Sequence, residues 1–95
     1  MTTDDKDILE HKAILEFPCQ FPIKIMGRDH AAFHEAARSI VGRHAGDISD
    51  DAVRQAASRK GNFVSVTITI EATSQQQLDD IYQDLTADEE ILVAL

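Results

Sequence analysis

Two short segments carry the residue types best suited to binding an anionic ligand. Gly27-Arg28-Asp29 precedes a segment with helical periodicity, and the free backbone N–H groups and the dipole at a helix N-terminus attract anions. Arg59-Lys60-Gly61 places two adjacent cations before a glycine that can adopt the positive φ of a hairpin turn. We therefore predict that a small anionic ligand binds in one of these segments, at Gly27 and Arg28 or at Arg59, Lys60 and Gly61.

Charge is unevenly distributed along the sequence. The net charge is −8, but residues 1–16 hold five acids and two bases, residues 72–95 hold six acids and no base, and residues 17–71 hold seven bases and six acids. The excess negative charge argues against nucleic acid as a partner, although an acidic surface also simply keeps a small protein in solution. The middle segment contains the bases that could face an anionic ligand, namely Lys24, Arg28, Arg54, Arg59 and Lys60.

Other reactive side chains lack the neighbours that catalysis or metal binding requires. His30 and His34 have the i, i+4 spacing of two metal ligands, but the glutamate of an HExxH motif is absent and no third ligand is evident. Cys19 has no flanking base to activate its thiol. Arg28 could serve a small hydrolase of the acylphosphatase type, but the longer glycine-patterned cradle of those enzymes is missing. We therefore expect a protein that is not an enzyme and that has no metal or cofactor.

Length and hydropathy bound the class of protein. A chain of 95 residues suffices for one domain, which we place at residues 15–95 behind a flexible or short helical acidic arm at residues 1–14. The longest wholly apolar run is five residues, 91–95, whereas a membrane span needs about 20. The acidic start lacks the basic and apolar regions of a secretion signal. We expect a cytoplasmic protein that does not enter a membrane.

Hydrophobic periodicity predicts six elements in the order β-α-β-β-α-β. Alternation predicts strands at residues 21–26, 52–58, 63–72 and 88–95, and apolar stripes predict helices at residues 29–45 and 74–86. We expect Gly27 to end the first strand in a tight turn and Asp29 to cap the first helix, with His44 as a structural cap near the C-terminus of that helix. Ser74 and Gln77 have the spacing of a capping box.

This order predicts a ferredoxin-like α+β sandwich, in which a four-stranded antiparallel sheet carries both helices on one face. The other sheet face would then be polar and rich in hydroxyl groups. It would be available to a ligand or a partner, and it would carry Lys24, Met26, Ser65, Thr67, Thr69 and Glu71.

Several separated blocks resemble one family of small bacterial proteins. The blocks are Leu15-Glu16-Phe17-Pro18, Lys24-Ile25-Met26-Gly27, Arg43-His44-Ala45 and residues 58–72. From about residue 15 to residue 95 the chain resembles the YbeD-like family of uncharacterised proteins. The resemblance implies a ferredoxin-like fold similar to ACT regulatory domains, and a link to lipoate metabolism through genomic association. Gly27 and Asp29 also resemble the ACT pattern of a loop that binds amino acids at a dimer interface, although His30 departs from it.

The sequence therefore predicts a non-enzymatic, ACT-like regulatory, ligand-binding or adaptor domain. Its partner would be a small anionic metabolite or another protein, and it could form a homodimer through a sheet edge or a helical face. Two alternatives stay open, a protein–protein interaction module with no small ligand and a small acylphosphatase-like hydrolase.

Overall fold

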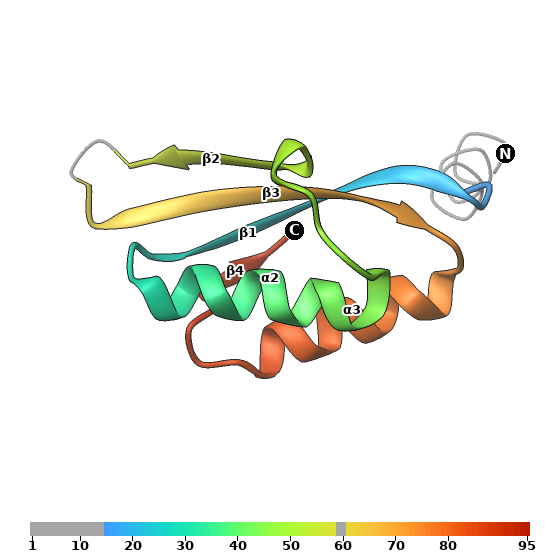
Figure 1. Cartoon of the computed structure of the whole chain (residues 1–95). Coiled ribbons are helices and arrows are strands. Elements are labelled where there is room, and N and C mark those ends of the chain that lie inside the picture. Colours follow the sequence, from blue (N-terminus) through green and yellow to red (C-terminus); the bar gives the residue numbers. More distant parts are fainter. Residues whose placement is uncertain (1–14, 59–60) are drawn as a thin grey trace, which may run out of the picture.

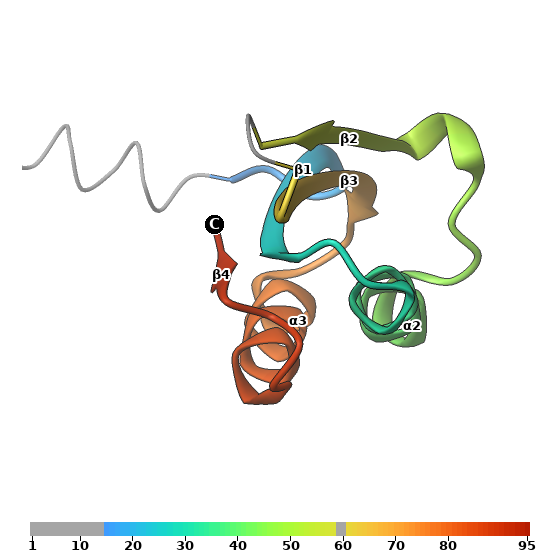
Figure 2. The same ribbon diagram turned by 90° about the vertical axis from the view of Figure 1, so that its left-hand side faces the viewer.

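The computed structural model describes residues 15–58 and 61–95, so the predicted arm at residues 1–14 lies outside the described residues (Figure 1). The elements are β1 (Cys19–Arg28), α2 (Ala31–Ala45), η1 (Asp50–Ala52), β2 (Val53–Ala57), β3 (Phe63–Ala72), α3 (Gln75–Ala87) and β4 (Val93–Ala94). The strands form one sheet in the order β2-β3-β1-β4, and every neighbouring pair is antiparallel. Both helices cover the same face of this sheet (Figure 2). The predicted ferredoxin-like fold is therefore confirmed.

The core lies between this covered face and the two helices. On β1 and β3, buried apolar residues alternate with exposed or half-buried ones, as the sequence pattern predicts for strands with one covered face. The helices contribute their apolar stripes to the same core. Its largest fully buried side chains are Phe33, Ile23, Ile25, Ile68, Leu78, Ile81, Leu85, Val41 and Val66.

The register of β1 and β3 determines what the opposite face displays, which we call the open face. The two strands pair over ten residues, from Cys19 opposite Ala72 to Arg28 opposite Phe63. Because alternate residues of a strand point to opposite faces, the even-numbered residues of β1 share the open face with the odd-numbered residues of β3. Lys24 thus lies opposite Thr67.

Gly27 has a different role from the predicted one. It does not end the strand in a turn but lies buried within β1, opposite Val64. A Cβ atom at this position would collide with the ring of Phe33 and would lie 2.6 Å from the backbone oxygen of Glu90. The glycine is needed because β1 approaches the first turn of α2 and the loop before β4 too closely for any side chain.

The start of α2 also differs from the prediction, whereas its end agrees. The residue at the N-cap is His30, whose side chain makes no capping hydrogen bond. Asp29 instead extends the ladder, since its N–H donates to Asn62 O (3.1 Å), and its carboxylate Oδ1 lies 2.8 Å from Nε2 of His34. At the other end, Gly46 follows the helix with a φ of 84°, a conformation that favours glycine.

A hydrogen-bond network joins α3 to α2. Ser74 Oγ accepts from the N–H of Gln77 (3.1 Å), as the capping box predicts, but Gln77 Oε1 accepts from the N–H of Thr73 (2.7 Å) instead of from Ser74. The amide of Gln77 also donates to His44 O (3.0 Å), and His44 Nε2 lies 2.7 Å from Asp84 Oδ2. The ring of His44, predicted to cap the end of α2, thus contacts α3 instead.

The last strand is much shorter than the predicted strand at residues 88–95. Residues before it form a turn, in which the N–H of Ile91 donates to Asp88 O (3.1 Å). A strand over residues 88–95 would place Ile91, Val93 and Leu95 on one face, but Ile91 is buried and the other two are exposed. The hydroxyl of Tyr82 donates to Leu95 O (2.8 Å), and burial raises the pKa of this phenol, so the neutral donor persists at neutral pH.

Candidate functional site

Gly61, the described residue of the second predicted segment, lies at the same end of the sheet as Arg28 of the first. Arg28, at the end of β1, pairs with Phe63, at the start of β3. The N–H of Asp29, the next residue, donates a hydrogen bond to Asn62 O. Gly61 has a φ of 73°, as a hairpin glycine should, while Arg59 and Lys60 lie outside the described residues. The described residues of the two predicted segments are thus close together in the fold.

Arg28 points onto the open face. Its guanidinium carbon lies 5.3 Å from the centroid of the Phe63 ring, which is the geometry of a cation–π contact. The charged group that lies next to the first turn of α2 is the carboxylate of Asp29, which contacts His34, and not the guanidinium of Arg28. The described residues therefore do not assemble a phosphate cradle from Arg28 and the helix N-terminus, which was the geometry behind the acylphosphatase alternative.

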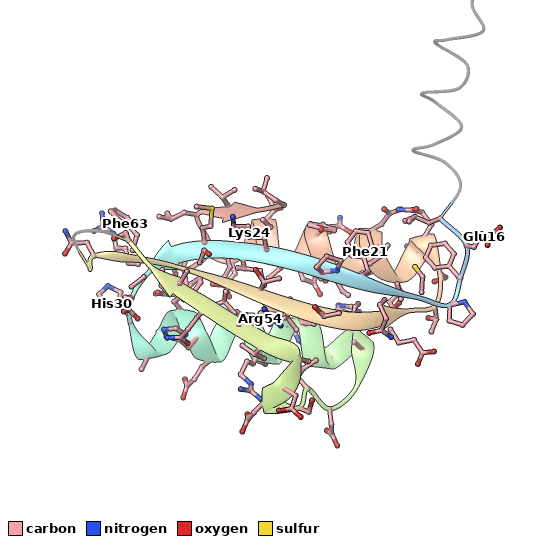
Figure 3. The ribbon with its side chains drawn as sticks, turned by 90° about the horizontal axis from the view of Figure 1, so that it is seen from above. Glu16, Phe21, Lys24, His30, Arg54 and Phe63 are labelled. Carbon is pink, nitrogen blue, oxygen red and sulfur yellow. The ribbon has the colours of Figure 1, made fainter. Side chains whose placement is uncertain are left out.

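Two more cations stand in one row across the open face. Lys24 of β1 and Arg54 of β2 both lie opposite Thr67 of β3, one on each side of it. All three point to the same face because residues directly opposite each other in a sheet share a face. Figure 3 shows Lys24, Arg54 and Phe63 on the sheet as seen from above. Together with Arg28, the described strands bring three cations to this face.

Many acids of the chain belong to its C-terminal segment, which lies on the covered side of the sheet. Residues 72–95, which form α3 and the chain that follows it, contain six acids and no base. On the described strands, the carboxylate that shares the open face with the cations is Glu71, near the far end of β3. On the described strands, the open face therefore carries three cations and one acid, although the chain as a whole is acidic.

An apolar hollow adjoins the cations. Phe63 and Met26 are 42% and 36% exposed, and they border a shallow hollow of about 110 Å³. Ala56 of β2, opposite Ser65, contributes to its floor. Sequence analysis missed this feature because the register of β2, a weak strand in the sequence pattern, is needed to place Ala56 beside Phe63. The open face thus offers cationic groups beside a small apolar surface.

A second depression lies between α2 and the loop after α3, but its charge differs. Three of the residues that line this depression are acids, namely Glu35, Asp88 and Glu90. Its arginine, Arg38, is engaged with the loop before β2, where Nη2 donates to Ile48 O (2.9 Å) and to Asp50 Oδ1 (3.2 Å). This depression is poorly suited to an anionic ligand.

Among residues 15–58 and 61–95, no group of three His, Cys, Asp or Glu side chains is arranged to hold a metal ion. In the same residues, neither helix is long and apolar enough to cross a membrane.

Comparisons with known proteins agree on one family. The family described as "Protein of unknown function (DUF493)" matches residues 12–95. A UPF0250 protein of Paraburkholderia phytofirmans is 40% identical over 85 residues, which cover 90% of this chain and 96% of that protein. The UPF0250 protein NE1487 of Nitrosomonas europaea is 43% identical over 77 residues, which cover 81% of this chain and 88% of that protein.

A solved structure supports the same fold. The solution structure of protein HP0495 from H. pylori matches with a TM-score of 0.61 over 86% of each chain, at 13% sequence identity. At this identity the likeness shows the fold alone. The sequence matches cover nearly all of the described residues. The chain belongs to the YbeD-like family of small bacterial proteins, the DUF493 family.

Proposed function

We propose that this chain is a non-enzymatic regulatory or adaptor domain that binds an anionic group on the open face of its sheet. The observation that carries this proposal is the row formed by Lys24, Thr67 and Arg54, which with Arg28 makes one face of an acidic molecule positive. A surface that gathers cations against the net charge attracts anions by electrostatic steering.

The chemistry of the face defines the ligand further. A carboxylate placed over Thr67 can accept charge-assisted hydrogen bonds from Lys24 and Arg54, and these are stronger than bonds between neutral groups. The hollow beside Phe63 and Met26 suits an apolar group attached to that carboxylate. Amino acids, which ACT domains bind, have both parts, and so do lipoate, octanoate and acidic protein segments.

A thermal-shift screen tests the proposal. The wild-type chain is heated with amino acids, lipoate, octanoate, nucleotides or a short acidic peptide, each at several concentrations. A ligand at 100 times its Kd stabilises the fold by about 2.7 kcal/mol, which for a domain of this size raises Tm by roughly 10–20 °C. We expect a carboxylate with an apolar part to give the largest shift.

A charge-matched pair of variants locates the binding. Arg54→Gln removes a cation from the open face, whereas Arg43→Gln removes one from the exposed surface of α2. The ligand shift should fall several-fold in the first variant and stay unchanged in the second. If both variants respond like the wild type, or if both lose the shift equally, the open face is not the binding surface and the proposal fails.

A further inference from the structure

Within the described residues, the outer edge of β2 has backbone groups without a hydrogen-bond partner. The N–H of Ser58 donates to Phe63 O (2.8 Å), which makes this pair a hydrogen-bonded one. Hydrogen-bonded pairs alternate along an antiparallel ladder, so Ala56 and Arg54 also direct their N–H and C=O groups toward β3. Gln55, between them, directs its own outward. The same holds for Ala57, whereas the N–H of Val53 donates to Asp50 O in the turn before β2.

Nothing on the described chain covers this edge. Sheet order places β2 at one end of the sheet, and its residues after Val53 are all exposed. Proline, a bulge and a covering element protect many natural edge strands, and the described residues provide none of these for β2, whose one charged side chain is Arg54 on the open face. Figure 2 shows β2 at the rim of the sheet, with α2 below the inner strands.

The opposite edge of the sheet is protected. The N–H of Lys24 in β1 donates to Leu95 O (3.1 Å), so even-numbered residues of β1 direct their backbone groups toward β4. Beyond the short β4, the next even-numbered residue is Pro22, which has no N–H to offer. The contrast singles out β2 as the edge that is open to a further strand.

We propose that β2 accepts an extended acidic segment of another protein as a fifth strand. This deepens the proposed function and rests on it. The residues of the segment that face Arg54 and Ala56 would lie on the open face, in the close pairs of the new ladder. An acid there meets Arg54, and an apolar side chain two positions away reaches the hollow beside Phe63. The segment therefore carries an acid and an apolar residue at i and i+2.

Charge favours an acidic partner over a second copy of this chain. Pairing of β2 with its own copy would extend the open face and bring a second set of Lys24, Arg28 and Arg54 onto one continuous surface. Like charges on one sheet face oppose association, whereas an acidic segment complements them. Backbone hydrogen bonds give such added strands their affinity, and the side-chain positions give them their specificity.

The test uses the full chain and a synthetic probe. The probe is a labelled, acetylated peptide, Thr-Val-Thr-Glu-Thr, which in antiparallel pairing places Val opposite Ala56 and Glu opposite Arg54. Binding is followed by fluorescence polarisation. N-methylation of the central Thr removes an N–H that faces Gln55, and it should weaken binding at least tenfold, as about 1.4 kcal/mol would. N-methylation of Val, whose N–H faces away, should change binding less than about twofold.

Two variants of Gln55 test the same hydrogen bonds from the side of the protein. Gln55→Pro removes the outward N–H of β2 without touching its bonds to β3, and Gln55→Thr keeps that N–H. We expect loss of binding in the first and near wild-type binding in the second, with Tm measured for both. Because the methylated peptides leave the protein unchanged, the test holds even if Gln55→Pro does not fold.

Several results would overturn the inference. Equal binding of the two methylated peptides would show that the edge does not pair with the probe. If Arg54→Gln still weakened binding in that case, the open face would remain the binding surface and the proposed function would stand. No binding of the probe at millimolar concentration would reject the fifth strand alone, because the thermal-shift screen tests the face independently. A dimer by light scattering that Gln55→Pro abolishes would assign the edge to a second copy.

Discussion

Replacement of Gly27 by alanine is expected to destabilise the fold by about 1–3 kcal/mol or more, the range for overpacking a close-packed interior. The new methyl group would collide with the ring of Phe33 and with the backbone oxygen of Glu90, 2.6 Å away. A ring can rotate aside, but a backbone oxygen moves only if the loop before β4 moves with it. Thermal unfolding measured by circular dichroism should show a drop in Tm of roughly 4–8 °C per kcal/mol.

Gly42 provides the control for this substitution. It lies within α2, and an added Cβ would have Ile48 Cγ1 as its neighbour at 4.0 Å, an ordinary contact. Gly42→Ala should therefore raise stability by about 0.5–1 kcal/mol, since glycine disfavours a helix interior. If Gly27→Ala were as stable as the wild type, or if both variants lost stability equally, the close approach at Gly27 would not be the reason for the glycine.

Phe33→Ala should have the largest effect of any single substitution considered, about 3–5 kcal/mol. Phe33 is fully buried at the start of α2 and is the largest of the fully buried side chains. Its removal leaves a cavity between β1 and α2 beside the position where the Gly27 substituent would be. Chemical denaturation measures this loss of unfolding free energy. The dependence of that free energy on denaturant concentration should match the wild type if the transition stays two-state.

The two substitutions should also be coupled. In the double variant, the methyl group of Gly27→Ala enters space that the Phe33 ring has left, so the combined loss should be smaller than the sum by about 0.5–3 kcal/mol. Leu85→Ala is the matched control, because Leu85 is equally buried but lies on α3, and the atoms nearest to an added Gly27 Cβ belong to Phe33 and Glu90 instead. Additive losses for Gly27→Ala with Phe33→Ala would contradict the packing described for β1.

Sequence periodicity predicted the parts of the fold in which one local rule dominates. The alternation in residues 63–72 and the stripe that contains Phe33 each report a single buried face, and both elements are found where they were expected. The capping contact of Ser74 with Gln77 depends on four consecutive residues and was also predictable. Local signals suffice where the contacts themselves are local.

The features that were not predicted depend on contacts between distant segments. Asp29 is a good capping residue by type, but the ladder to Asn62 extends past β1 and uses its backbone, so the helix begins later. Gly27 is predicted as a turn residue from its type alone, but the close approach of Phe33 and Glu90 is the reason that a glycine is needed there. In both cases tertiary contacts override a local preference.

In the candidate site, too, local residue types were predictable but their arrangement in space was not. Arg28 and Arg54 were recognised as bases that could face an anion, but the sequence does not show which bases share a surface. The registers of β1 and β2 against β3 place Lys24 and Arg54 on either side of Thr67 and collect the cations on one face. A five-residue strand with one β-branched residue gives no register from its sequence alone.

The most direct test is to measure where anions gather on this chain. In solution NMR, paramagnetic relaxation of backbone amides is compared for two nitroxide probes of similar size, one with a carboxylate and one with an ammonium group. The account predicts that the carboxylate probe relaxes the amides of Lys24, Arg54 and Thr67 more strongly than the ammonium probe, with the opposite preference along α3, and that both differences shrink as salt is added. Equal relaxation by the two probes at the open face, or a stronger effect of the ammonium probe there, would contradict it.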